Sequence, residues 1–285
     1  MRLAVLSDIH SNFAALEACL LDKRVQAADG LLFLGDYVTD CPYPERTTAR
    51  IRSLAKDIPC WLLRGNREDY LLDYDCSPVK DWSYGSNRGS LLYTYESLGK
   101  ENLDFYRTLP TNAIVFLPNA TPLTIVHGSP SATRELLLPG KENSRSTLRC
   151  AETAELLCGH SHKQFIFRQD GRQLINPGSV GLSISETHDA HFAILEFYDS
   201  AWHTELCHIP YDVDRVIAAF YECGLMEKAT IWSMCIIASL RTGKDLAPSC
   251  ARLARKLAAS RQPDHVPAYI PEPFWKAAAH QLGVL

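Results

Sequence analysis

The sequence of 285 residues lacks several features that mark special classes of protein. Its ten cysteines include no Cys-x-x-Cys pair, so a zinc ribbon or a thioredoxin-like redox site has no support. No apolar run reaches about 18 residues, the length expected of a membrane span, and the start MRLAVLSDIH shows no leader pattern. We therefore expect a cytoplasmic protein that has no membrane partner and keeps most of its thiols buried and reduced.

An excess of positive charge is also missing. The formal net charge is −4, with no stripe of lysine and arginine, so nucleic acid is not an expected partner. A small phosphorylated substrate, such as a nucleotide, stays compatible with this charge because bound metal ions supply their own local positive charge. Hydrophobic residues make up 46% of the chain, which is enough for a proper core.

Short apolar runs alternate with amphipathic stretches, a rhythm that predicts an α/β protein. Buried strands are expected at residues 3–6, 31–34, 61–63, 114–117, 123–126 and 156–158. Helices are expected at 12–21, where Asn12 can cap the first turn, and at 45–56, which follows Pro44.

After residue 160 the pattern changes twice. Closely spaced strands at 165–168, 173–175, 191–197 and 202–208 predict hairpins that complete the sheets. Three or four helices then follow, at 212–223, 227–241, 248–260 and 273–281. We place a domain boundary near residue 210. Residues 211–285 would form a helical appendage that could cap a site or pair with a second chain in a homodimer.

Polar residues stand where several of the predicted strands end. Asp8 and His10 follow the first strand, and because side chains alternate along extended chain, they should point the same way. The others are Asp36, Asn66, His127, His160 and His162. Open α/β sheets place their sites at this edge. One such residue is weak support, but seven nitrogen and oxygen ligands could hold two metal ions that share one carboxylate.

The blocks around these residues are SDIH (7–10), GDYV (35–38), GNRE (65–68), VHGSP (126–130), GHSH (159–162) and NPGSVG (176–181). Over residues 1 to about 200 the chain thus resembles the calcineurin-like metallophosphoesterase superfamily, in its small bacterial phosphodiesterase or diadenosine-tetraphosphatase branch. The resemblance implies a four-layer αββα sandwich of two mixed sheets flanked by helices. It also implies two ligand sets, one of Asp8, His10, Asp36 and His162, the other of Asp36, Asn66, His127 and His160.

Such a pair of divalent ions, roughly 3.5–4 Å apart, can hold a bridging hydroxide that attacks phosphorus. Asp36 must be a carboxylate to bridge them. Because no thiolate is among the ligands, manganese, iron, zinc and cobalt all remain open. We therefore expect a two-metal hydrolase of phosphoester or phosphoanhydride bonds, with Asp36, Asn66 and Arg67 as catalytic residues and a phosphodiester or (di)nucleoside polyphosphate as substrate.

Arg67 departs from the family pattern, in which many members have a histidine that protonates the leaving group. Arginine stays protonated and cannot act as that acid, although it can stabilise developing negative charge. The alternative is a surface salt bridge from Arg67 to Glu68 or Asp69. If Arg67 faces the substrate, we expect a preference for leaving groups that need no proton.

Two other functions stay open at this point. One is a scaffold of the same fold that binds metal and partners without turnover. The other is a DNA exonuclease, which shares the metal blocks but is disfavoured by the acidic charge.

Overall fold

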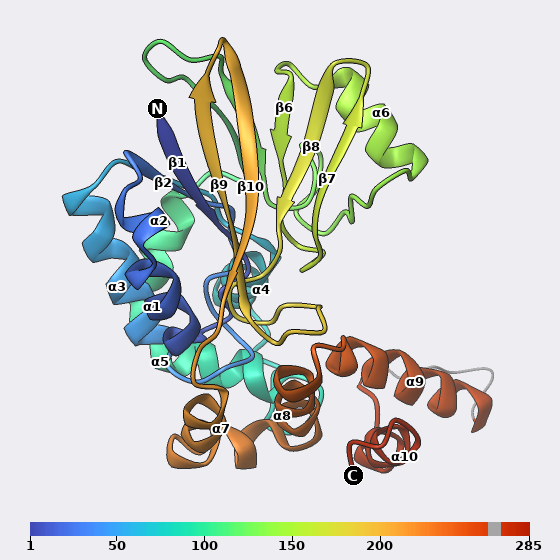
Figure 1. Cartoon of the computed structure of the whole chain (residues 1–285). Coiled ribbons are helices and arrows are strands. Elements are labelled where there is room, and N and C mark those ends of the chain that lie inside the picture. Colours follow the sequence, from blue (N-terminus) through green and yellow to red (C-terminus); the bar gives the residue numbers. More distant parts are fainter. Residues whose placement is uncertain (262–268) are drawn as a thin grey trace.

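The computed structural model describes residues 1–261 and 269–285, and its strands form two mixed sheets that lie face to face (Figure 1). The first sheet has the order β10 (Ala201–Ile209), β9 (Ala190–Tyr198), β1 (Arg2–Leu6), β2 (Gly30–Phe33) and β3 (Cys60–Leu62). The second has the order β4 (Asn112–Val115), β5 (Leu123–Val126), β6 (Glu155–Leu157), β8 (Arg172–Pro177) and β7 (Gln164–Gln169). In the first sheet the strands β1, β2 and β3 are parallel and β9 and β10 add an antiparallel side. In the second sheet the parallel strands β5, β6 and β8 form the centre, and β4 and β7 are antiparallel edges.

Alternating side chains divide the core into layers. Along β1, Leu3 and Val5 pack between the two sheets, whereas Ala4 and Leu6 pack against helices. The outer face of the first sheet is covered by α1 (Phe13–Leu21), α2 (Lys23–Gln26), α3 (Pro44–Asp57) and α5 (Gly89–Thr108). Helix α6 (Glu142–Cys150) covers the second sheet. The expected four-layer αββα sandwich is confirmed (Figure 1).

The expected strands all occur, each within one or two residues of its predicted bounds. Asn12 caps α1 as expected, because its side chain accepts a hydrogen bond from the backbone N–H of Ala15. The sequence patterns did not identify α2, α5, α6 or α4 (Asn66–Cys76). All ten cysteines are free thiols, and six of them are buried. Among the helices in residues 1–261 and 269–285, none is both long and apolar enough to cross a membrane.

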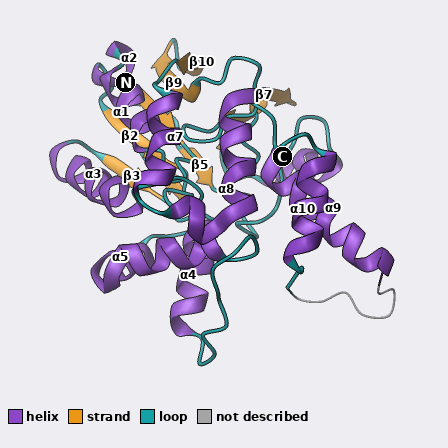
Figure 2. Ribbon diagram, turned by 90° about the horizontal axis from the view of Figure 1, so that it is seen from below, coloured by secondary structure: helices purple, strands orange, loops and turns teal. Residues whose placement is uncertain are grey.

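Four helices follow the last strand: α7 (Val213–Glu222), α8 (Leu225–Thr242), α9 (Leu246–Arg261) and α10 (Glu272–Gln281). Seen from below, α7 and α8 lie in front of the strand ends (Figure 2). Helix α8 approaches α5 so closely that a Cβ atom at Gly89 would lie 2.0 Å from the carbonyl oxygen of Lys228. The apolar cluster of these helices also includes Cys41 and Tyr93 from the preceding part of the chain. The boundary near residue 210 stays a prediction.

Candidate metal centre

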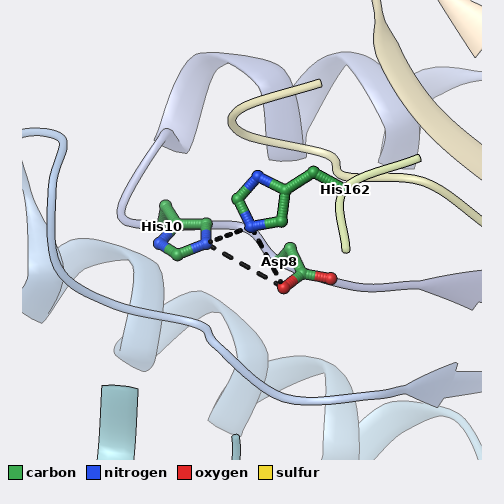
Figure 3. Close-up of side chains that lie close together, drawn as sticks. All are labelled: Asp8, His10 and His162. Carbon is green, nitrogen blue, oxygen red and sulfur yellow. Dashed lines mark hydrogen bonds and ion pairs between the residues drawn. The ribbon is translucent and has the colours of Figure 1, made fainter. Parts of the chain in front are cut away.

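Two groups of ligand-type side chains converge where the strands end. One group contains Asp8, His10 and His162, and Figure 3 shows their side chains pointing toward one another. The other contains Asp36, His127 and His160. Within each group the candidate ligand atoms all lie within 4.8 Å of one another. Asn66, the first residue of α4, joins the second group, with its Oδ1 atom 3.1 Å from His127 Nε2.

Asp36 faces both groups. Its Oδ1 atom lies 3.4 Å from His127 Nε2, and its Oδ2 atom lies 3.8 Å from His10 Nε2. The structure thus brings all seven predicted ligands together, with one carboxylate between the two groups. Their role as ligands stays a prediction.

The hydrogen-bond partners of the histidines test whether metal ions fit. Nδ1 of His162 lies 2.8 Å from the carbonyl oxygen of Leu182, and Nδ1 of His10 lies 3.1 Å from Asp40 Oδ2. The carbonyl oxygen of Leu182 can only accept, so Nδ1 of His162 carries a proton and its Nε2 atom is the one that faces the group. Nδ1 of His10 lies at ion-pair distance from Asp40, which leaves its Nε2 atom facing the group as well. The two Nε2 atoms lie 3.0 Å apart. Two ring nitrogens at this distance need a proton or a cation between or beside them, so this donor set can accept a metal ion.

The same holds in the second group. His127 Nδ1 lies 2.7 Å from the carbonyl oxygen of Leu34, so its Nε2 atom is the one that faces the oxygens of Asp36 and Asn66. A proton or a cation must separate these atoms. In both groups an oxygen acceptor lies beside the Nδ1 atom, and the Nε2 atom points to the place where a metal ion could bind. This arrangement is usual for metal-binding histidines.

Side-chain alternation is not what brings Asp8 and His10 together, so that reason was wrong. Strand β1 ends at Leu6, and both residues have left-handed backbones, with φ of 54° and 51°. Their backbone N–H groups donate to the carbonyl oxygens of Gly35 and Asp36. The two loops are therefore tied together, and the left-handed turns aim both side chains inward.

Glu68 holds the Asp36 loop through hydrogen bonds, and we did not predict this role. Its carboxylate is fully buried and accepts hydrogen bonds from the backbone N–H groups of Asp36, Tyr37 and Gly65. Gly65 has no room for a side chain, since a Cβ atom there would lie 2.2 Å from Asp36 Oδ1. Glu68 therefore fixes the loop that carries the shared carboxylate, and Gly65 lets the next loop approach it.

Asp40 is a second supporting residue that the sequence patterns missed. It is buried behind His10, and its Oδ2 atom lies 3.1 Å both from His10 Nδ1 and from a guanidinium nitrogen of Arg67. The indole N–H of Trp232 donates to its Oδ1 atom at 2.8 Å. Arg67 and His10 hold the pKa of Asp40 well below its usual range, against the effect of burial.

Arg67 itself lies at the site. Its side chain is 19% exposed, and its ion-pair partner among the described residues is Asp40 rather than Glu68 or Asp69. Its backbone N–H donates to Asp36 Oδ1 at 2.8 Å. The alternative of a surface salt bridge to Glu68 or Asp69 is therefore wrong.

The NPGSVG block holds the two histidine-bearing loops in place. The amide of Asn176 donates to the carbonyl oxygen of Gly159 at 2.7 Å and to Ser161 Oγ at 3.1 Å. Ser179 Oγ donates to the backbone carbonyl of Asp8 at 2.7 Å. This block therefore positions ligand-bearing loops from outside the ligand set.

Electrostatics at the site follow from closely packed buried charges. Burial disfavours ionised Asp8 and Asp36, but neighbouring histidines outweigh it and hold both pKa values low. Burial also favours the neutral ring of His127, yet Asp36 outweighs it and raises the pKa of His127 to about 10. Burial and the charge of His127 lower the pKa of His160 to about 4.

Known proteins resemble this chain over most of its length. Residues 1–200 match the family model of the calcineurin-like phosphoesterase superfamily domain. A curated relative, an uncharacterized protein of Methanocaldococcus jannaschii, is 27% identical over 235 residues, which cover 75% of this chain and 89% of that protein.

Two solved structures share the fold over most of the chain. A metallophosphoesterase of Sphaerobacter thermophilus has a TM-score of 0.66 and 24% identity, with 85% of this chain and 100% of that chain covered. A hypothetical protein of Pyrococcus horikoshii has a TM-score of 0.71 and 22% identity, with coverage of 85% and 98%. At these identities the likeness concerns the fold alone.

Proposed function

The chain belongs to the calcineurin-like phosphoesterase superfamily, and from this premise we propose that it hydrolyses phosphoester or phosphoanhydride bonds with two divalent metal ions. The observation that carries the proposal is the position of Asp36, whose two oxygens face different groups of histidines. His10, His162 and Asp8 would hold one ion, and His127, His160 and Asn66 the other. Bound divalent ions supply Lewis acidity toward phosphate oxygens and lower the pKa of a water molecule toward neutrality.

The chain's own residues orient the predicted metal ligands and supply hydrogen-bond donors and positive charge for the phosphate. Asp36 lies in a fixed position between the two histidine groups, because Glu68 holds its loop and the backbone N–H of Arg67 holds its carboxylate. Asn66 adds an amide beside the second group and can donate to a phosphate oxygen with its nitrogen. The Arg67 guanidinium, held by Asp40, provides positive charge next to His10.

Arg67 also defines the preferred leaving group in this proposal. A guanidinium cannot give a proton to a departing alkoxide but can stabilise an anion. Phosphodiesters with acidic leaving groups and phosphoanhydrides, as in (di)nucleoside polyphosphates, are therefore the substrates we propose.

Turnover of bis(4-nitrophenyl) phosphate with Mn²⁺ tests the function. The wild-type protein should release nitrophenolate, and Asp36→Asn should abolish the release because the amide cannot bridge two cations. Binding of Mn²⁺ without any turnover would favour the non-catalytic scaffold instead. A salt-sensitive shift of DNA in a gel would favour the exonuclease.

A further inference from the structure

A hollow of about 200 Å³ opens beside the candidate metal centre, and arginines from three separate segments line it. Arg67 comes from α4, Arg88 from the turn before α5, and Arg255 from α9. We call this space the arginine hollow. Arg67 and Asp40 also line a smaller space that reaches His162. The arginine hollow therefore lies directly next to the metal centre, on the far side of Arg67.

The charges in the arginine hollow are not balanced. Asp40 is engaged by His10, Arg67 and Trp232. Arg88 and Arg255 are exposed, and the ion pairs found in residues 1–261 and 269–285 include neither of them. Nε of Arg67 is buried and has no hydrogen-bond partner in the same residues. In a chain with a net charge of −4, three guanidinium groups around one carboxylate are a local excess of positive charge.

The walls of the arginine hollow are held by hydrogen bonds between the two parts of the chain. Asn87 donates to the carbonyl oxygen of Ile270 at 2.7 Å and accepts from its N–H at 2.9 Å. The backbone N–H and the hydroxyl of Ser86 both donate to the Glu272 carboxylate at 2.7 Å. The hydroxyl of Tyr269 donates to the carbonyl oxygen of Asp81. The walls are thus formed before a ligand arrives, which lowers the cost of binding.

We propose that the arginine hollow binds a second phosphate group of the substrate, so that the preferred substrates carry a chain of phosphates. The proposal rests on the proposed function, which places the reacting phosphate at the metal centre. Guanidinium groups bind phosphate through paired N–H donors, and Arg67 stands between the two positions. The C-terminal helices then contribute to substrate choice, because Arg255 belongs to α9.

Inhibition by inorganic triphosphate tests the proposal, with inorganic phosphate as the single-phosphate probe. Both are added to bis(4-nitrophenyl) phosphate hydrolysis at excess Mn²⁺. In Arg88→Gln/Arg255→Gln, loss of two charge-assisted contacts should raise the inhibition constant of triphosphate at least about tenfold. The inhibition constant of phosphate and the kcat/KM for bis(4-nitrophenyl) phosphate should change less than about twofold, since these ligands do not reach the hollow.

Arg252→Gln is the matched control, because Arg252 lies three residues before Arg255 in α9 and faces Asp245 and Ser249 instead. It should leave the triphosphate constant unchanged. An unchanged constant in the double variant, or an equal rise for phosphate and triphosphate, would overturn the proposal.

Failure of the proposed function can be told apart from failure of this proposal. If the wild-type protein turns over no substrate, titration calorimetry with inorganic triphosphate still tests the hollow. The dissociation constant should again rise about tenfold in the double variant and stay constant in Arg252→Gln. Equal binding by all three proteins would overturn the proposal on its own.

Discussion

Trp232 donates its indole N–H to Asp40 at 2.8 Å, and the other oxygen of Asp40 lies 3.1 Å from the ring of His10. A C-terminal helix is thereby connected through one carboxylate to a predicted metal ligand. Partners of this kind fix the ring orientation and basicity of metal-binding histidines. Helix α8 therefore contributes a contact to the candidate metal centre, and α9 contributes to the lining of the arginine hollow.

Trp232→Phe should weaken metal binding. The substitution keeps the aromatic ring and removes the N–H, so the buried Asp40 loses a donor and holds His10 less firmly. Loss of such an outer partner typically costs about 10–100-fold in metal affinity. Calorimetric titration of the metal-free protein with Mn²⁺ measures the change in dissociation constant.

Trp202→Phe is the control for this variant. The Trp202 indole also donates to an oxygen, the carbonyl of Thr121 at 3.0 Å, but on the sheet away from the metal centre. Its Mn²⁺ affinity should match the wild type. A similar loss in both variants would show that the effect is general destabilisation.

Glu68→Gln should destabilise the fold and loosen the site. Three backbone N–H groups point at the buried Glu68 carboxylate, and the amide of glutamine would place its own N–H groups against at least one of them. An unpaired buried donor costs about 1–3 kcal/mol. Urea unfolding should show a lower midpoint with an unchanged slope. Glu152→Gln, at an exposed position, should show neither change.

Metal affinity should rise with pH. In the metal-free protein Asp36 raises the pKa of His127 to about 10, so at neutral pH this ring holds a proton that a metal ion must displace. One displaced proton makes the apparent affinity rise about tenfold per pH unit below that pKa. Calorimetric titrations with Mn²⁺ in buffers of different ionisation enthalpy should detect the released proton. Affinity independent of pH would contradict this protonation state.

The raised pKa of His127 should also make the stability of the metal-free protein fall as the pH rises. The folded pKa of His127 lies above its ordinary value of 6.5. The stability that the charged ring provides is therefore complete below about pH 6.5 and is lost as the pH rises toward 10. Metal-free protein should unfold at a lower temperature at pH 9 than at pH 6.5, whereas this difference should shrink when Mn²⁺ is bound.

Arg67→His should change how the rate depends on the leaving group. With Arg67, kcat for a series of aryl phosphodiesters should fall steeply as the leaving-group pKa rises, because no side chain donates a proton. Histidine can donate one, so the slope should flatten. A wild-type rate that is already independent of leaving-group pKa would contradict the role given to Arg67.

The predicted ligands could be located from the sequence because each follows a short apolar strand, and strand ends in this fold meet at one edge. Asp40 and Glu68 could not, since their partners are set by the fold. Asp40 lies in a loop with a left-handed backbone, φ 69°, and no strand directly precedes it. Glu68 reads as an ordinary acidic residue in the first turn of a helix, and only its burial beneath Asp36 gives it a role.

The missed helices have weak local signals. Helix α5 begins with Gly89 and is interrupted at Gly99, which has a φ of 67°, so its pattern does not continue through a single helical period. Helix α8 was predicted from residue 227 onward, but its break at Thr230 was not, and a distant contact lies next to that break. The N–H of Ile231 donates to Ser86 Oγ, which lies 145 residues earlier in the chain. Such tertiary hydrogen bonds leave no trace in the local sequence.

Two metal ions should flank Asp36. Crystals grown with Mn²⁺ and measured at its absorption edge test it most directly. The anomalous map should contain two peaks, one touching His10 and His162, the other touching His127 and His160, with Asp36 touching both. A single peak, or peaks that Asp36 does not touch, would contradict the account.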